Sequence, residues 1–306
     1  MRATRTFLAI AVATALASGC GSKGKVADKA SFKVLPKDSD LLIGINGAKA
    51  RGASQLDEVL RQAPPRVAAV LSKLKSCGID VVKGLDTVYI AGNSTTQRGV
   101  LAIKGFNKGQ IEQCGQVAKE LALTTKDNLT SMTVNGRPVY LAWADDSTFL
   151  TGPNWAGKDL QNLASGSGGA DSNSDLMNLV GEVDGDAALW FVFAPPKDSP
   201  LLGAMSSMGG PVQALFGSVS VSGGGLTIHV GIRSKDADSA SQISSALKMV
   251  LPQVEGMAGK EIGAIAQKVE VSSSGDKVKL KLSLSKADLD TLQKIAPMAA
   301  GMLGGG

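Results

Sequence analysis

Residues that often carry catalysis and metal binding are scarce in this sequence. Among 306 residues there are 3 cysteines and 1 histidine, and aromatic residues make up 4%. Two of the cysteines, Cys77 and Cys114, stand far apart with no histidine near them, which argues against the usual ligand spacing of a zinc site. The formal net charge is only +5. With so little positive excess and so few aromatic residues, the sequence gives no support for nucleic-acid binding.

The sequence also shows no catalytic centre. The single histidine, His229, shares one face of a predicted strand over residues 226–232 with Thr227 and Arg233, and apolar residues occupy the other face. A catalytic base needs an orienting partner and a pocket, and the sequence indicates neither. We therefore interpret His229 as an ordinary surface histidine. No serine stands in a Gly-x-Ser-x-Gly motif, so we expect a protein that is not an enzyme and needs no cofactor.

One glycine-rich stretch has the spacing of a phosphate loop. Residues 152–159 read GPNWAGKD and follow a predicted strand, so backbone N–H groups at the next helix start could bind an anion. Asp159, however, replaces the Ser or Thr that would bind magnesium, and its carboxylate would repel phosphate. We interpret the stretch as the entry to a helix, with Trp155 as a packing anchor.

No apolar run is long enough to cross a bilayer as a permanent helix. A short uncharged run, Thr6–Gly19, follows Arg2 and Arg5. A basic start, a short apolar core and a boundary of small residues are typical of an export signal. Cleavage after Ala15-Leu16-Ala17, an A-x-A pattern, would release a soluble exported protein. The alternative is cleavage before Cys20, which the residues that lead up to this cysteine favour.

The residues Ala17-Ser18-Gly19-Cys20 follow the apolar core, and here the chain resembles bacterial lipoproteins. In that family a lipobox ends in Cys, the thiol receives a diacylglycerol, and cleavage leaves the lipidated Cys as the N-terminus. The match departs from the family at Ala17, where Leu is favoured. The resemblance implies a signal peptide over residues 1–19 and lipidation of Cys20. Because Gly21 rather than Asp follows, it also implies an outer-membrane lipoprotein that faces the periplasm.

A basic stretch follows Cys20. Residues 20–38 contain five lysines, at positions 23, 25, 29, 33 and 37. We expect a flexible tether that is either a soluble spacer or also contacts anionic headgroups. The expected partner is therefore the membrane, reached through the N-terminal lipid.

Cys77 and Cys114 are candidates for a disulfide bond. An even pair of cysteines in an oxidising compartment favours a bridge. Cys77 follows the apolar face of one predicted helix, and Cys114 lies on the apolar face of another. Packing of both helices on one sheet would bring the thiols together. The alternative is two buried free cysteines that pack as small hydrophobic residues.

The order of strands and helices predicts an α+β protein built from two similar halves. Each half reads strand, helix, hairpin, helix, hairpin, helix, and consecutive hairpins predict antiparallel sheets with helices on one face. Turn residues predict hairpins at residues 93–94, 135–136 and 274–276, and Asn135-Gly136 is the strongest of these signals. Ser285 and Asp288 form a capping box that predicts the start of the last helix. We assign residues 39–165 to the first half, 166–173 to a Gly/Ser linker, 174–297 to the second half and 298–306 to a Gly/Met-rich tail. This layout resembles uncharacterised Gram-negative lipoproteins of unknown function, a group that supplies no catalytic motif.

One apolar run combines small residues with methionine. Glycine loosens the backbone and methionine adapts its shape, which suits a surface that receives varied apolar partners. The candidate contact residues are Leu201, Leu202, Met205, Met208 and Leu215. The alternative is a connector that covers the core.

Two functional interpretations follow from these observations. The leading one is a non-enzymatic, lipid-anchored envelope lipoprotein, a structural or binding module for a protein or hydrophobic ligand of unknown identity. The second is a periplasmic carrier or chaperone that shields acyl chains or apolar exported segments.

Overall fold

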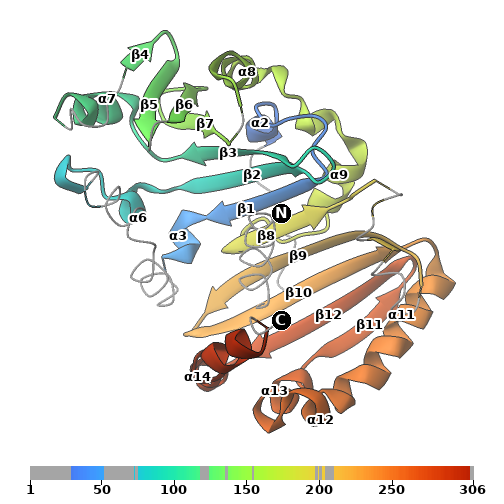
Figure 1. Cartoon of the computed structure of the whole chain (residues 1–306). Coiled ribbons are helices and arrows are strands. Elements are labelled where there is room, and N and C mark those ends of the chain that lie inside the picture. The colour runs from blue at the N-terminus through green and yellow to red at the C-terminus, as the bar shows by residue number, and fades with distance from the viewer. Residues whose placement is uncertain are drawn as a thin grey trace. The chain divides into compact units, whose positions relative to one another are not determined.

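The computed structural model describes residues 29–51, 72, 75–117, 124–134, 137–153, 155–196, 199, 202–203 and 210–303. Contacts within the chain define two compact units, which divide after residue 194. Both units combine helices with antiparallel strands (Figure 1), which confirms the predicted α+β class. Over these residues, no helix has both the length and the apolar character needed to cross a membrane.

The N-terminal unit is built on a sheet of eight described strands. They are β1 (Leu41–Asn46), β2 (Thr87–Asn93), β3 (Arg98–Lys104), β4 (Thr124–Lys126), β5 (Leu129–Val134), β6 (Arg137–Trp143), β7 (Thr148–Thr151) and β8 (Leu189–Phe193). Their order is β8-β1-β2-β3-β7-β6-β5-β4, and each neighbouring pair is antiparallel. Val134 pairs with Arg137, which confirms the hairpin predicted at residues 135–136.

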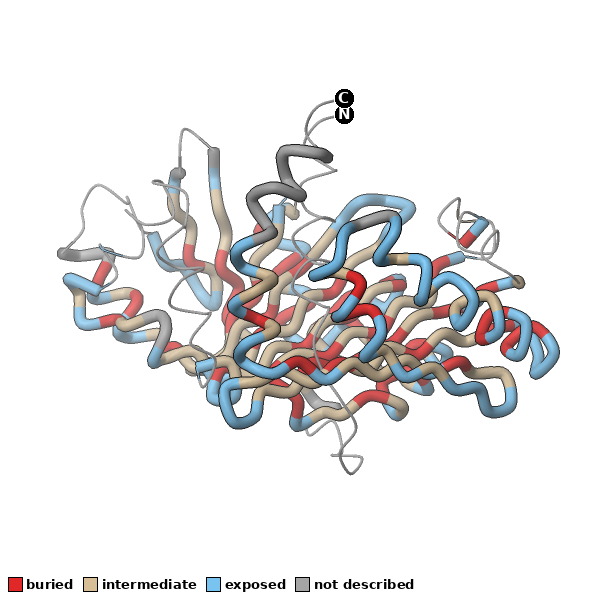
Figure 2. Tube along the Cα trace, turned by 90° about the horizontal axis from the view of Figure 1, so that it is seen from below, coloured by how far each residue is buried: buried red, intermediate tan, exposed pale blue. Residues whose placement is uncertain are grey.

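Short helices connect these strands. The α-helices are α2 (Lys29–Phe32), α3 (Gly47–Ala50), α6 (Val81–Gly84), α7 (Lys108–Val117), α8 (Gly157–Asn162) and α9 (Ser174–Val180). A π-helical turn, η2 (Leu163–Ser167), and a 3-10 turn, η3 (Ala170–Ser172), lie between α8 and α9. Along the tube of Figure 2, buried residues concentrate in the strands, while turns and outer helix surfaces are exposed.

One face of this sheet carries an aromatic cluster around a glycine. In the strand register, Gly44 of β1 lies between Tyr89 of β2 and Trp190 of β8. Phe32 of α2 is fully buried and meets both rings edge-on, with ring centroids 5.5 Å from Tyr89 and 6.2 Å from Trp190. A Cβ atom at position 44 would overlap the indole of Trp190. Glycine at this position therefore makes room for the buried tryptophan.

Helices cover the opposite face of the sheet as well. Ile111 and Cys114 of α7 form a core cluster there with Trp143 of β6 and Phe149 of β7. The next residue of β7, Leu150, points to the other face and is also fully buried. The prediction that helices pack on one face is therefore wrong for this unit, because its strands carry large apolar side chains on both faces.

The folded part of the chain starts before the predicted end of the tether at residue 38. Phe32 and Leu35 are both fully buried. Apolar side chains removed from water in this way hold the backbone in place. Helix α2 begins at Lys29, so the last ten residues of the predicted tether belong to the folded unit, and residues 20–28 lie outside the described residues.

Residues 166–173, predicted as a linker, are packed inside the N-terminal unit. The backbone N–H groups of Gly169 and Ala170 donate to the carbonyl oxygens of Lys33 and Leu35, at 3.0 and 3.1 Å. β8 follows this segment and pairs with β1. The boundary between the units therefore falls after β8. Main-chain hydrogen bonds, rather than polar composition, determine which sheet a segment joins.

The C-terminal unit contains four described strands and a layer of helices. The strands are β9 (Val212–Ser222), β10 (Gly225–Ser234), β11 (Glu270–Ser274) and β12 (Lys277–Leu284), in the antiparallel order β11-β12-β10-β9. The helices are α11 (Ala237–Val250), α12 (Val254–Ala258), α13 (Lys260–Ala266) and α14 (Lys286–Leu303), with a 3-10 turn, η4 (Leu251–Gln253), after α11. α14 extends through most of the tail predicted at 298–306.

Alternation along β10 and β12 gives this sheet one apolar face. Val278 of β12 is fully buried and clusters with Ala240 and Ile243 of α11. Ile228 of β10 clusters with Leu289 of α14 and with α13. α11, α13 and α14 therefore lie along the same face of the sheet (Figure 1).

A capping box determines where α14 begins. The Asp288 carboxylate accepts the N–H of Ser285 at 2.8 Å, and Ser285 Oγ accepts the N–H of Asp288 at 3.3 Å, as the sequence predicts. Lys268 Nζ donates to the same carboxylate at 2.7 Å. The hydrogen bond from Lys268, followed by those from Ser285, lowers the pKa of Asp288 from 3.8 to about 2. The cap is therefore charged throughout the neutral and mildly acidic range.

Candidate functional site

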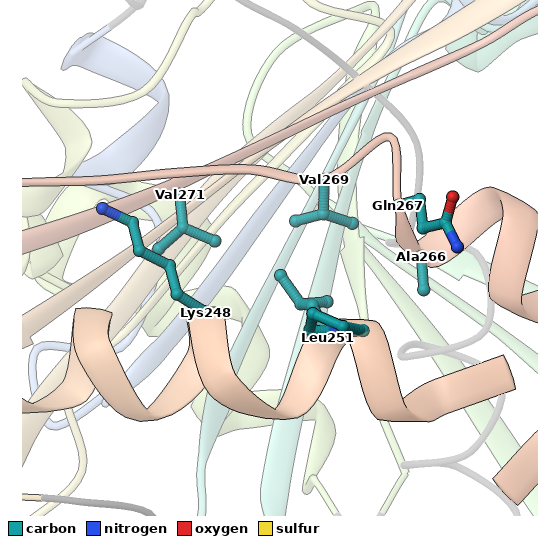
Figure 3. A pocket seen from close by; sticks show the side chains of 7 residues that line it. Lys248, Leu251, Ala266, Gln267, Val269 and Val271 are labelled. Carbon is teal, nitrogen blue, oxygen red and sulfur yellow. The ribbon is translucent and has the colours of Figure 1, made fainter. Parts of the chain in front are cut away.

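A groove opens in the C-terminal unit between the end of α11 and strand β11. Its volume is about 300 Å³, at the lower end of the range for ligand sites in proteins. Figure 3 shows α11 on one side of the groove and the β11 segment on the other. The lining residues are Lys248, Leu251, Pro252, Ala266, Gln267, Val269 and Val271.

The local sequence explains how the chain forms this groove. Pro252 lacks a backbone N–H, so the α-helix ends and the chain continues as the 3-10 turn η4. Gly259, with a φ of 93°, then turns the chain between α12 and α13. α13 returns past η4 and leads into β11. Val269, just before β11, and Val271 within it point toward the groove (Figure 3).

The groove is apolar except at its ends. Lys248 and Gln267 lie toward opposite ends in Figure 3. Within the described part of the chain, Lys248 forms no ion pair. Met249 and Val250 follow Lys248 on α11, and 65% and 51% of their surfaces are exposed. Chemically, the groove can hold a short apolar group and offers one ammonium group to an anionic end.

Among the described residues, the predicted site residues do not form a metal-binding cluster. Residues 29–303, apart from the gaps given above, contain no group of three or more His, Cys, Asp or Glu side chains that could hold a metal ion. His229 is half-buried, and in register it pairs with Ser218 of β9 and Lys281 of β12. Its strand position is the one predicted, although the side chain is less exposed than expected for a surface histidine.

The structure brings the two predicted disulfide cysteines together. Cys77 and Cys114 are bonded, with an S–S distance of 2.14 Å and a Cα–Cα distance of 5.3 Å. Cys114 is 1% exposed and belongs to the core cluster under α7. The predicted bridge is confirmed. Cys20, the predicted lipidation site, lies outside the described residues.

The predicted apolar contact surface belongs in part to the core. Leu202 is 6% exposed and clusters with Val212, and Leu215 packs against the same cluster from within β9. Leu201, Met205 and Met208 lie outside the described residues. The prediction of an accessible surface is therefore wrong for Leu202, while Leu215 is partly buried in β9. Both positions agree with the alternative of a connector that covers the core.

The segment with the phosphate-loop spacing, residues 152–159, packs against strand β3. Trp155 Nε1 donates to the carbonyl oxygen of Gly99 at 3.0 Å, and the Arg98 guanidinium lies 3.8 Å from the centre of the Trp155 ring. Arg98 also lies 3.9 Å from the Asp159 carboxylate. The stretch thus fixes α8 to β3, which agrees with the interpretation of Trp155 as an anchor.

The sequence did not reveal the groove of the C-terminal unit. The sequence held one indication of the groove. At the end of α11 the one-sided hydrophobic pattern is lost, because LKMVLP places apolar residues all around the helix. A proline then ends the helix. Such an end exposes apolar side chains, but only the return of α13 and β11 turns them into one wall of a groove.

Comparisons with known proteins show a similarity of fold and nothing about function. No family model and no curated protein matches the chain. Among solved structures, crystal form III of TP0453, a Treponema protein, is similar with a TM-score of 0.53 and 10% sequence identity, over 84% of this chain and 94% of that one. Crystal form I of TP0453 gives a TM-score of 0.52 and 8% identity, over 85% of this chain and 95% of that one.

Proposed function

We propose that the chain is a non-enzymatic envelope lipoprotein, anchored by a lipid on Cys20 to the outer membrane and facing the periplasm, whose folded body is a binding module. The observation that carries this proposal is the Cys77–Cys114 bond. Disulfides persist in oxidising compartments such as the periplasm. The bond uses two of the 3 cysteines of the chain. The third, Cys20, follows the export signal at the distance that lipidation requires.

The short tether supports a role close to the membrane. Phe32 is the first residue known to be buried, and an extended chain from Cys20 to Phe32 spans at most about 40 Å. A lipid on Cys20 would therefore hold the N-terminal unit near the bilayer surface.

The proposal includes an internal duplication. The N-terminal unit contains the order hairpin β2-β3, helix α7, hairpin β5-β6 and, after β7, helix α8. The C-terminal unit contains hairpin β9-β10, helix α11, hairpin β11-β12 and helix α14. A shared order of this kind supports two similar halves, which divide after residue 194 rather than at the predicted linker.

Replacing Cys20 with serine tests the anchor. In cells supplied with a fatty-acid analogue, the parent chain should be labelled and should sediment with membranes. The Cys20→Ser chain should lose the label completely, because serine has no thiol to receive the diacylglycerol. Cys77→Ser is the matched control and should keep the label. Labelling that persists in Cys20→Ser would contradict the anchor.

The groove of the C-terminal unit favours a second function, a carrier of acyl chains. Its apolar lining and the ammonium group of Lys248 match a short acyl chain with an anionic end. Exposed apolar groups beside it, Met249 and Val250, are unusual on a surface helix and fit a site that receives apolar partners.

Filling the groove tests the carrier function. Leu251→Trp should occupy the groove and weaken binding of a fluorescent medium-chain fatty acid at least tenfold, with little change in thermal stability. Lys248→Gln should weaken binding of the fatty acid but not binding of its uncharged methyl ester. Gln242→Ala, an exposed change on α11 that does not line the groove, is the control and should bind as the parent does. Equal binding by the parent and Leu251→Trp would exclude the groove as the site.

A further inference from the structure

The face of the C-terminal sheet opposite α11, α13 and α14 carries cations. β12 reads KVKLKLSL, and because alternate residues point to opposite faces, Lys277, Lys279 and Lys281 share the face opposite α11, α13 and α14. In register, Arg233 of β10 pairs with Lys277, and His229 pairs with Lys281. We call Arg233, Lys277, Lys279 and Lys281 the lysine face.

Small and hydroxyl-bearing residues surround these cations. Antiparallel register also places Ala214, Phe216 and Ser218 of β9 and Gly231 of β10 on this face, and these four residues are buried. The remaining residues of the face are Ser220 of β9, Thr227 of β10, Ser272 and Ser274 of β11, and Ser283 of β12. Hydroxyl groups can donate hydrogen bonds to an anion held by a neighbouring lysine. Ser272 and Ser274, like Lys279, are exposed, so this part of the face is open to solvent.

Acidic residues compensate the lysine face only in part. Lys281 Nζ lies 3.2 Å from Glu270, and Arg233 Nε lies 3.7 Å from Asp276. Lys279 is exposed and forms no ion pair with any other described residue. Like charges on alternate residues of a strand lie about 7 Å apart and repel each other, whereas opposite charges across strands would stabilise the sheet. Glu270 and Asp276 therefore do not balance the charge of all four cations, and Lys279 remains exposed.

We infer that the lysine face docks onto the anionic headgroups of a lipid bilayer. The cations occupy two neighbouring strands of one sheet rather than a cleft, so they can contact a plane of phosphates together. Basic surfaces of this kind bind anionic membranes through electrostatic attraction, and long lysine side chains reach the headgroups without burial of the backbone. This docking is additional to the proposed lipid anchor and does not depend on it.

Vesicle binding of the full chain tests the docking. Every variant carries Cys20→Ser, so that a lipid on Cys20 does not contribute. The chain should bind vesicles of equimolar phosphatidylcholine and phosphatidylglycerol, should bind phosphatidylcholine vesicles far less, and should dissociate as salt is raised. The triple change Lys277→Gln, Lys279→Gln and Lys281→Gln should weaken anionic binding about 100-fold, since each lysine near an anionic surface contributes about fivefold.

A charge-matched triple change is the control. Lys260→Gln, Lys286→Gln and Lys294→Gln remove three exposed lysines from α13 and α14, on the helix-covered side, and should leave vesicle binding close to that of the parent. If the first triple variant fails to fold, Lys279→Glu alone should still weaken binding about 25-fold, because two units of charge are lost.

Three outcomes would overturn the inference. Equal losses in the two triple variants would show that only net charge matters. Equal binding to anionic and uncharged vesicles would remove the electrostatic basis. Binding to a soluble polyanion such as heparin, with none to anionic vesicles, would assign the lysine face to a different class of partner. Fatty-acid labelling of the parent chain tests the Cys20 anchor separately, so failure of one proposal is distinguishable from failure of the other.

Discussion

Removal of the Cys77–Cys114 bond is expected to lower the free energy of unfolding of the N-terminal unit by about 3–4 kcal/mol. The bond closes a loop with a sequence separation of 37, and opening that loop lets the unfolded chain explore many more conformations. Cys114 is also part of the core with Trp143 and Phe149. For a unit of this size, the loss corresponds to a fall of about 10 °C in the thermal midpoint.

Thermal unfolding of the double variant Cys77→Ala/Cys114→Ala measures this effect. Alanine is preferred to serine because position 114 is 1% exposed and a serine hydroxyl there would be buried. A reductant should lower the midpoint of the parent towards that of the variant and leave the variant unchanged. Alkylation of the exported parent under denaturing, non-reducing conditions should modify neither cysteine. Two free thiols would contradict the bond in the exported protein.

Replacement of Gly44 by alanine is expected to destabilise the same unit through a clash. The new Cβ atom would overlap the indole of Trp190, which is 3% exposed and cannot move without disturbing its contact with Phe32. Overpacking of this kind costs about 1–3 kcal/mol. Trp190→Ala removes a large buried side chain and should cost about 3–5 kcal/mol.

The double variant Gly44→Ala/Trp190→Ala separates the clash from other effects of each change. Without the indole, the methyl group has room, so the double variant should be more stable than the sum of the single effects predicts, by about 1–3 kcal/mol. Gly92→Ala in the adjacent strand is the control, since its new Cβ would meet no atom closer than 3.7 Å. Chemical denaturation measures the stability of the parent and of the four variants. Strict additivity would show that Gly44 does not serve to accommodate Trp190.

The sequence by itself determined most of the local structure. Alternating apolar residues and turn residues located the hairpins at residues 93–94, 135–136 and 274–276, because strand periodicity and turn conformation depend on a few neighbouring residues. The box of Ser285 and Asp288 located the start of α14 for the same reason. The disulfide pair was predictable because few cysteines were available and both lay on apolar helix faces.

Only the tertiary structure decided which segments pack together. The polar composition of 166–173 predicted a linker, yet its N–H groups bond to residues 33 and 35, and β8 joins β1 from far along the chain. The sequence also gave no sign that helices cover both faces of the N-terminal sheet. In each case hydrogen bonds and apolar contacts between distant segments outweigh local preference, and their partners cannot be identified from one stretch of sequence.

The candidate sites show the same division. The alternation KVKLKLSL is visible in the sequence, but only the positions of α11, α13 and α14 leave its lysines on the face opposite these helices. The groove requires α11, α13 and β11 to meet, so no single segment contains its signal. For Leu202 and Leu215 the sequence left open a contact surface or a connector over the core, and packing against β9 and α11 buries Leu202 and half-buries Leu215. The sequence determines which side chains are present. Which of them are exposed depends on the elements that cover them, because burial arises from contacts between residues far apart in the chain.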